Sequence, residues 1–280
     1  MKRWVIFCFV CVFVVLCAMH SWAVDPFDNW ASPEGWYFIN YPFFYSADEY
    51  TDKNGDTLMS DFDMKMYQNI FRICYYNKTL LPNTWVLSAF IPYTKLEVLD
   101  DDAAGIGDLT LVGGYFFKED QATKTYLGSG LYLDAPTGSY DENKTANVGE
   151  NVWRIRPFLG FAKMFGPVDF EMTMKYNIST ENSDSKIKEG NEFIFESYAG
   201  SFLSRKFLLG AHINYISQGD SEYDGTKLAD SSSQRWQAGP MFLFSQSEEI
   251  SVMLQILQDF ATTNSPEGTL FMTRICWKFD

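Results

Sequence analysis

The residues of this chain that could do chemistry are charged side chains at alternate positions of several segments. Arg154 and Arg156 show the arrangement most clearly, because Trp153, Ile155 and Pro157 take the opposite face. Charges held in this way can pair into a salt-bridge network, or they can line a water-filled path and set its selectivity. The full set is Arg72, Asp108, Asp134, Arg154, Arg156, Asp169, Glu171, Lys175, Glu196, His212, Arg235, Asp259, Arg274 and Lys278.

An acidic stretch offers a second kind of site. Asp52, Asn54 and Asp56, with Asp63 further on, space oxygen ligands as a calcium-binding loop does. Thr57 stands where such a loop has glycine, and Asp63 replaces the usual glutamate. A turn with solvated acidic side chains is the simpler interpretation, so we expect no metal and no other cofactor.

A single histidine, His212, follows residue 23, and Asn214 shares its face. A hydrolase would need this histidine as a base beside a nucleophile or an acid. A hydrogen-bonded structural histidine is the simpler interpretation, and one histidine argues against a histidine-rich metal site. We therefore expect no catalytic residues and no enzymatic activity.

The elements that carry these residues are about twelve segments with a period of two, the count of a mid-sized barrel. In one of them, Phe170 and Met172 face one way while Asp169 and Glu171 face the other. That period belongs to a strand with one apolar and one polar face. We therefore predict an all-β fold, a transmembrane antiparallel β-barrel with apolar residues outside and polar residues inside. The predicted strands are 35–46, 64–77, 83–94, 105–118, 123–136, 147–163, 166–178, 191–203, 206–218, 233–245, 249–261 and 268–279.

The connections between these strands alternate in length. Tight turns alternate with longer polar loops, which include residues 46–63, 137–150, 179–190 and 219–233. Short periplasmic turns and long extracellular loops are typical of outer-membrane barrels, and an even strand count brings both ends to one rim. A secreted soluble all-β domain is the alternative.

The beginning of the chain predicts export. Lys2 and Arg3 precede an apolar run over residues 4–17, and small residues lie at Ser21 and Ala23. This is the pattern of a secretory signal peptide cleaved after Ala23, because the apolar run is shorter than the ~20 residues of a membrane-spanning helix. We expect residues 1–23 to be a signal peptide and residues 24–280 to form one barrel domain.

The last predicted strand carries a second targeting signal, in addition to the signal peptide. Phe271, Ile275, Trp277 and Phe279 alternate with Met272, Arg274, Cys276 and Lys278. A final strand that ends in an aromatic residue resembles the sorting signal read by the outer-membrane assembly machinery, although Asp280 follows Phe279 here. We therefore expect the cell outer membrane of a Gram-negative bacterium as the location.

Composition sets further limits. Aromatic residues make up 18% of the chain, which suits the interfacial girdles of a barrel. The formal net charge of -14 argues against a nucleic-acid partner, because phosphates would be repelled. Cys74 and Cys276 lack metal-ligand spacing, and a disulfide between them stays open as an alternative.

Three stretches resemble the motifs of one bacterial family. Residues 105–111 read Gly-Ile-Gly-Asp-Leu-Thr-Leu, residues 133–140 read Leu-Asp-Ala-Pro-Thr-Gly-Ser-Tyr, and residues 147–153 read Asn-Val-Gly-Glu-Asn-Val-Trp, with Pro157 and Gly160 following. They resemble the outer-membrane "transporter" family named for the meta-pathway of phenol degradation. The resemblance implies a barrel that passes small, often aromatic, compounds, and it offers no catalytic residues to carry over.

The function we predict is a passive channel or facilitator for small solutes, with outer-membrane lipid as its surroundings. The charges either hold a narrow barrel rigid or line its path, and about twelve strands allow both. Asp134 is expected to lie opposite Arg154 and to pair with it. The alternatives are a surface-binding or structural barrel, and a barrel hydrolase that uses His212 as base.

Overall fold

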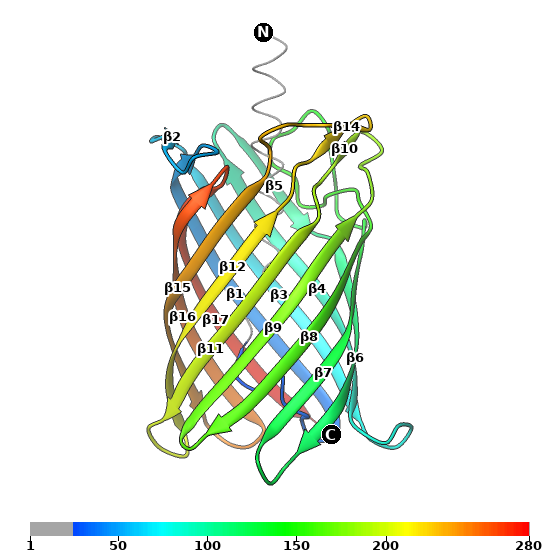
Figure 1. Cartoon of the computed structure of the whole chain (residues 1–280), viewed down its shortest axis with the longest axis vertical. Helices are drawn as coiled ribbons and strands as arrows, with labels where there is room; N and C mark the ends of the chain where they lie inside the picture. The colour runs from blue at the N-terminus through cyan, green and yellow to red at the C-terminus, as the bar shows by residue number, and fades with distance from the viewer. Residues whose placement is uncertain (1–24, 280) are drawn as a thin grey trace.

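The computed structural model describes residues 25–279, so the predicted signal peptide lies outside the described residues. Twelve long strands form one antiparallel barrel, which closes where β17 pairs with β1 (Figure 1). They are β1 (Gly35–Thr51), β3 (Met64–Asn77), β4 (Trp85–Val98), β6 (Leu109–Asp120), β7 (Thr125–Ala135), β8 (Arg154–Phe165), β9 (Val168–Ser179), β11 (Glu192–Phe202), β12 (Phe207–Gln218), β15 (Ser233–Ser245), β16 (Ile250–Thr263) and β17 (Pro266–Phe279). The predicted strand order and the closed barrel are confirmed.

Short strands decorate one rim. They are β2 (Thr57–Met59), β5 (Asp101–Ile106), β10 (Ile187–Lys188), β13 (Glu222–Tyr223) and β14 (Thr226–Lys227). Figure 1 shows β2, β5, β10 and β14 at the end with long loops, while the short turns and the described end of β17 lie at the opposite rim. The predicted alternation of short turns and long loops is therefore present.

The barrel wall has polar side chains inside and apolar side chains outside, the reverse of a water-soluble protein. In β9, Asp169, Glu171 and Lys175 are buried, while Met174 and Tyr176 are exposed on the outside. A period of two places each set on its own face, and exposed apolar side chains suit the lipid around a barrel. Within residues 25–279, no helix combines the length and the apolar character needed to cross a membrane.

Two predicted strands begin later than the sequence pattern indicates. The strand predicted from residue 147 begins at Arg154, because Asp108 accepts the N–H of Glu150 and holds the preceding residues as a loop. The strand predicted from residue 105 divides into β5 and β6 at Gly107, whose N–H binds the carbonyl of Pro92 at 2.9 Å. The hairpin that extends β4 through β5 was not predicted.

Candidate functional site

The barrel lumen gathers the charged residues identified in the sequence. Asp108 lies half-buried between β5 and β6, and Lys278 is half-buried near the end of β17. The other side chains are buried inside the barrel, namely Arg72, Asp134, Arg154, Arg156, Asp169, Glu171, Lys175, Glu196, His212, Arg235, Asp259 and Arg274. Their burial among strands that alternate polar and apolar residues places them together in one interior.

Several of these charges pair across neighbouring strands. Lys175 Nζ lies 2.7 Å from Glu196 Oε2, between β9 and β11. Arg235 Nε lies 3.7 Å from Asp259 Oδ1, between β15 and β16. Such pairs satisfy charges that are shielded from bulk water and brace adjacent strands.

The predicted partner of Asp134 is wrong, although its register is right. Asp134 and Arg154 are opposite each other in the β7–β8 ladder. The ion pair of Asp134 is instead formed with Arg156 Nη2 at 2.5 Å. Arg154 Nη2 turns toward the loops and contacts Glu150 at 2.5 Å and Glu189 at 2.8 Å.

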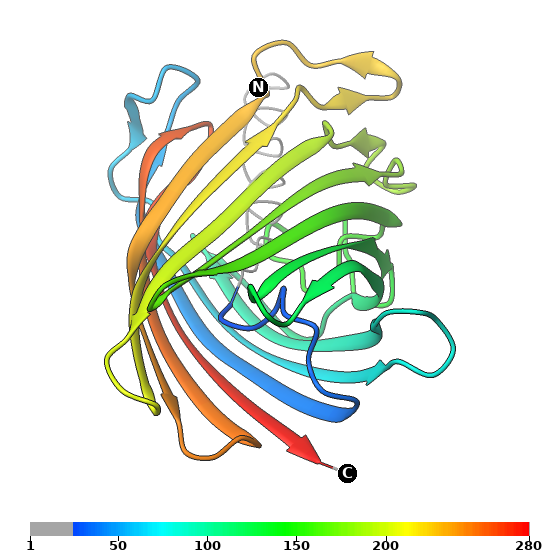
Figure 2. The ribbon, with the colours of Figure 1, turned by 60° about the horizontal axis from the view of Figure 1, so that its bottom comes forward.

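Residues 25–34, which precede β1, enter the lumen from the short-turn rim (Figure 2). We call them the lumen segment. Sequence reasoning assigned these residues no role, because they have no strand periodicity. The wall contacts that hold them come from strands far away in the sequence.

Glu171 on β9 binds the backbone of the lumen segment. Its carboxylate accepts the N–H of Phe27 at 2.5 Å and the N–H of Asn29 at 2.8 Å. The side-chain amide of Asn29 donates to Thr173 Oγ1 at 3.0 Å. Trp30 Nε1 donates to Asp169 Oδ1 at 3.3 Å, so β9 alone contacts three residues of the segment.

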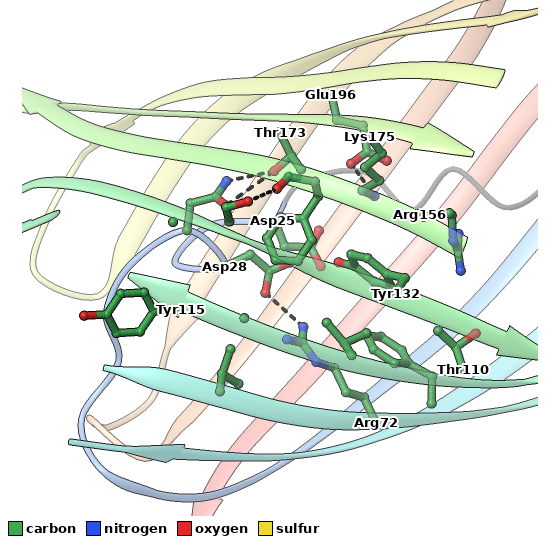
Figure 3. Close-up of a pocket in the computed structure, with 18 of the residues that line it drawn as sticks. Asp25, Asp28, Arg72, Thr110, Tyr115, Tyr132, Arg156, Thr173, Lys175 and Glu196 are labelled. Atoms are coloured by element: carbon green, nitrogen blue, oxygen red, sulfur yellow. Dashed lines mark hydrogen bonds and ion pairs between the residues drawn. The ribbon is translucent and has the colours of Figure 1, made fainter. Parts of the chain in front are cut away.

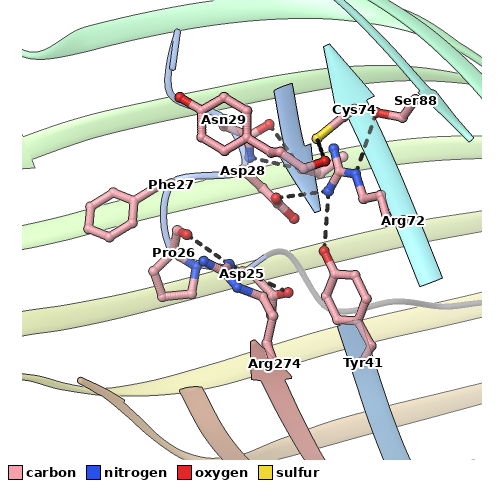
Figure 4. A network of polar contacts seen from close by, with 12 residues as sticks. Asp25, Pro26, Phe27, Asp28, Asn29, Tyr41, Arg72, Cys74, Ser88 and Arg274 are labelled. Carbon is pink, nitrogen blue, oxygen red and sulfur yellow. Dashed lines mark hydrogen bonds and ion pairs between the residues drawn. The ribbon is translucent and has the colours of Figure 1, made fainter. Parts of the chain in front are cut away.

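The opposite side of the lumen segment rests on two arginines (Figure 4). Arg72 Nη1 lies 3.1 Å from Asp28 Oδ1, and it also donates to the Tyr41 hydroxyl at 3.2 Å. Arg274 Nη1 donates to the carbonyl of Pro26 at 2.9 Å and lies 3.7 Å from Asp25 Oδ2.

Aromatic contacts add to the polar ones. The ring of Phe27 stacks on Phe202 with centroids 6.4 Å apart, and the ring of Trp30 lies 5.1 Å from that of Tyr126. Gly160 of β8 leaves the space that Asn29 fills, because a Cβ there would come 2.1 Å from Asn29 Oδ1. The lumen segment is therefore held in the barrel by close packing, by aromatic contacts and by ion pairs.

A cavity of about 70 Å³ remains between the lumen segment and the wall (Figure 3). Its lining combines rings with charged side chains, as Arg72 over the ring of Phe90 and Arg156 over the ring of Tyr132 show, both at 5.0 Å. Three lining residues belong to the lumen segment, namely Asp25, Asp28 and Asn29. The lining therefore has the mixture of apolar rings and a few polar groups that is typical of small-molecule sites.

A second cavity, of about 60 Å³, lies beyond the ion pair of Asp134 and Arg156. Asp134, Glu150 and Arg154 line it, whereas Arg156 lines the first cavity and Thr110 lines both. The Asp134–Arg156 pair therefore stands between two hollows in the same barrel.

The remaining candidates from the sequence are His212 as a catalytic base and the cysteines as a disulfide. His212 is buried and stacks on Tyr198 with centroids 5.4 Å apart, and among the described residues neither ring nitrogen has a hydrogen-bond partner. A histidine base requires a nucleophile within hydrogen-bond reach. Cys74 and Cys276 are free thiols.

The acidic stretch forms a turn. Asp52 Oδ1 accepts the N–H groups of Asn54 at 2.8 Å and Asp56 at 3.0 Å. The N–H of Asn54 is the main cause that lowers the pKa of the Asp52 carboxyl. Over residues 25–279, no three His, Cys, Asp or Glu side chains cluster as a metal site would require.

Comparison with known proteins gives the family. Residues 47–275 match the profile of the family described as "Putative MetA-pathway of phenol degradation". The chain belongs to this family. No match was found among curated proteins.

Solved structures share the fold. An outer membrane channel from Pseudomonas putida F1 superposes with a TM-score of 0.85 at 22% identity, covering 91% of this chain and 100% of that one. The β domain of the Bordetella autotransporter BrkA gives 0.53 at 9% identity, covering 89% and 100%. The NalP translocator domain from Neisseria meningitidis gives 0.51 at 10% identity, covering 89% and 90%. The fold is that of an outer-membrane β-barrel.

Proposed function

We propose that this protein is a channel in the outer membrane of a Gram-negative bacterium that passes small aromatic or otherwise hydrophobic solutes without energy input. The observation that carries the proposal is the lumen cavity, where rings such as Tyr132 and Phe158 lie 5.2 Å apart beside charged side chains. Ligand sites of this class combine apolar walls with a few polar groups that orient the ligand. The family description names phenol degradation, which fits an aromatic solute, and the similar P. putida protein is described as an outer membrane channel.

The lumen segment is the part of this channel that must move. A dry cavity of roughly 150 Å³ is one that holds benzene. The cavity beside the segment measures about 70 Å³, so a ring does not fit while Asp25, Asp28 and Asn29 line it. Withdrawal of the segment joins its own space to the cavity and opens the lumen.

The charges of the lumen would then select among solutes. Arg72, Arg156, Lys175 and Glu196 line the cavity, so a solute meets these groups as it passes. In this proposal the remaining inward pairs, such as Arg235 with Asp259, brace the wall. We assign no catalytic step, because within residues 25–279 neither ring nitrogen of His212 has a hydrogen-bond partner, and a histidine base needs a nucleophile within that reach.

Flux through purified protein tests the proposal. The mature protein and a variant lacking residues 25–33 are reconstituted into liposomes, and the entry of sugars and amino acids is compared with that into empty liposomes. Phenols cross lipid unaided, so their uptake is measured in intact cells that express either protein. Heat-modifiable migration on gels confirms that each barrel is folded.

We expect the deletion to raise the flux of polar solutes severalfold, and the full chain to speed phenol uptake over cells without it. If neither folded protein raised the flux above that of empty liposomes or of cells without the protein, the channel proposal would be contradicted. That result would favour a surface-binding role for the loops instead.

We further propose that β17 carries the signal for the outer-membrane assembly machinery. Phe271, Ile275 and Trp277 are exposed on the outer face, and Trp277 packs on Phe279 with centroids 5.5 Å apart. Replacing Phe279 by Ser is expected to reduce the amount of folded barrel in the outer membrane, as measured in membrane fractions. Unchanged amounts would remove this proposal.

A further inference from the structure

The positive charges inside the barrel fall into two groups according to where their counter-ions lie. In the first group, each cation pairs with a carboxylate on the barrel itself or its loops. Arg156 contacts Asp134, Lys175 contacts Glu196, and Arg235 contacts Asp259. Arg154 belongs to this group as well, with Glu150 and Glu189. None of these carboxylates belongs to the lumen segment.

Arg72 and Arg274 form the second group. Among the described residues, their ion pairs are with Asp28 and Asp25, and both of these carboxylates belong to the lumen segment. The side chains of Arg72 and Arg274 are 10% and 4% exposed, so neither is bathed in bulk water while the segment is seated. Both therefore depend on the segment for charge balance.

The two arginines lie on β3 and β17, the two strands that flank β1. Arg72 of β3 is opposite Ile39 of β1. On the other edge of β1, the ladder with β17 pairs Asn40 with Ile275, the residue after Arg274. Figure 4 shows Asp28 and the Tyr41 hydroxyl against Arg72, and Asp25 and Pro26 against Arg274.

We propose that Arg72 and Arg274 form an anion site that the lumen segment occupies with its own carboxylates, and that the solute is an aromatic or other hydrophobic carboxylate that takes their place. This inference rests on the proposed channel function and specifies its substrate class. When the segment leaves, the two arginines lose their counter-ions, and a ligand that brings a carboxylate replaces those charge-assisted contacts. Arginine suits this role because its planar fork binds carboxylates with two parallel hydrogen bonds.

The lumen segment has the same chemical groups as such a solute, namely carboxylates next to aromatic rings. It presents the carboxylates of Asp25 and Asp28 beside the rings of Phe27 and Trp30. An anionic ring compound would find matching partners, because Phe90 lies beneath the Arg72 guanidinium and lines the cavity. A ligand shifts an equilibrium only through contacts that differ between the two states, and these contacts become free only when the segment leaves.

Electrical recordings in planar bilayers test the inference directly. The first protein is the variant lacking residues 25–33, recorded in a gradient of potassium benzoate. We expect benzoate to be about tenfold more permeant than potassium, as the strength of charge-assisted contacts implies. Arg72→Gln and Arg274→Gln in this background should each bring that ratio close to one. Arg205→Gln, an exposed arginine in the turn between β11 and β12, is the matched control and should leave the ratio unchanged.

The full chain gives a second test in which every barrel residue is kept. Benzoate should raise the open probability, whereas benzyl alcohol, which has a similar shape and no charge, should not. The double variant Asp25→Asn and Asp28→Asn should open severalfold more often without any added solute, because its segment no longer neutralises the arginines.

The outcomes separate this inference from the proposed function. Current through the truncated barrel without preference for benzoate, together with equal effects of benzoate and benzyl alcohol on the full chain, would overturn the anion site and leave the channel standing. Absence of any current from folded truncated barrels would overturn the channel and the anion site together.

Discussion

At the scale of single residues, register does not decide which charges pair. Asp134 and Arg154 are opposite in the ladder, yet the carboxylate binds Arg156, two residues further along β8. Diagonal neighbours on one face of a sheet lie within reach of long side chains. Arg154 forms its ion pairs with two loop carboxylates near the rim, Glu150 and Glu189.

This arrangement predicts which pairs of mutations are coupled. A double-mutant cycle with Asp134→Asn and Arg156→Gln should show a coupling of about 1 to 3 kcal/mol, because both side chains are buried and in direct contact. The cycle that pairs Asp134→Asn with Arg154→Gln should show a smaller coupling, because the ion pairs of Arg154 are with Glu150 and Glu189. Free energies of unfolding, measured by urea titration of the refolded barrels, provide both values. A larger coupling with Arg154 would restore the pairing expected from register alone.

At the scale of elements, the lumen segment and β8 fit together through a missing side chain. Gly160 faces the lumen and is buried, and Asn29 occupies the space beside it. From there the Asn29 amide reaches Thr173 Oγ1 and the carbonyl of Met172. One glycine on the wall therefore permits hydrogen bonds from the segment to β9.

Substitution of this glycine should loosen the lumen segment while leaving the barrel folded. Gly160→Ala places a methyl group where Asn29 Oδ1 now lies, so the Asn29 hydrogen bonds are lost. We expect the open probability in planar bilayers to rise about fivefold, the factor that ~1 kcal/mol supplies. Gly113→Ala is the control, because its methyl group would meet only Leu87 Cδ2, at an ordinary 3.7 Å. Equal behaviour of the two variants would show that Asn29 does not hold the segment.

The sequence predicted the strands well and the site incompletely. A period of two is local, so the strands that include Asp169 and Arg154 could be recognised from adjacent residues, and their inward faces followed. The lumen segment could not be recognised in that way. Its contacts join residues far apart, such as Asn29 with Glu171, and residues 25–34 carry no repeating pattern of their own.

At the scale of the whole molecule, charge is divided between two places. The lumen holds cations and carboxylates in pairs, whereas the acidic excess behind the formal net charge of -14 includes loop residues such as Asp52, Asp141 and Asp184. Long loops gather at one rim, and the short turns, including residues 246–249, lie at the other. Outer-membrane barrels place their long loops outside the cell and their short turns in the periplasm.

That division predicts the orientation of the barrel, which chemical labelling of intact cells can measure. In a background with Cys74→Ser and Cys276→Ser, single cysteines are introduced as Glu142→Cys in a long loop or Glu248→Cys in a short turn. Both glutamates are exposed, so neither change disturbs packing. A large maleimide that does not cross the outer membrane should label the first variant in whole cells and the second only after lysis.

Labelling of Glu248→Cys alone in whole cells would show that the barrel has the opposite orientation. The lumen segment would then enter from outside the cell. The anion site would in that case face the incoming solute directly, whereas in the predicted orientation the solute reaches Arg72 and Arg274 only after passing the Asp134–Arg156 pair.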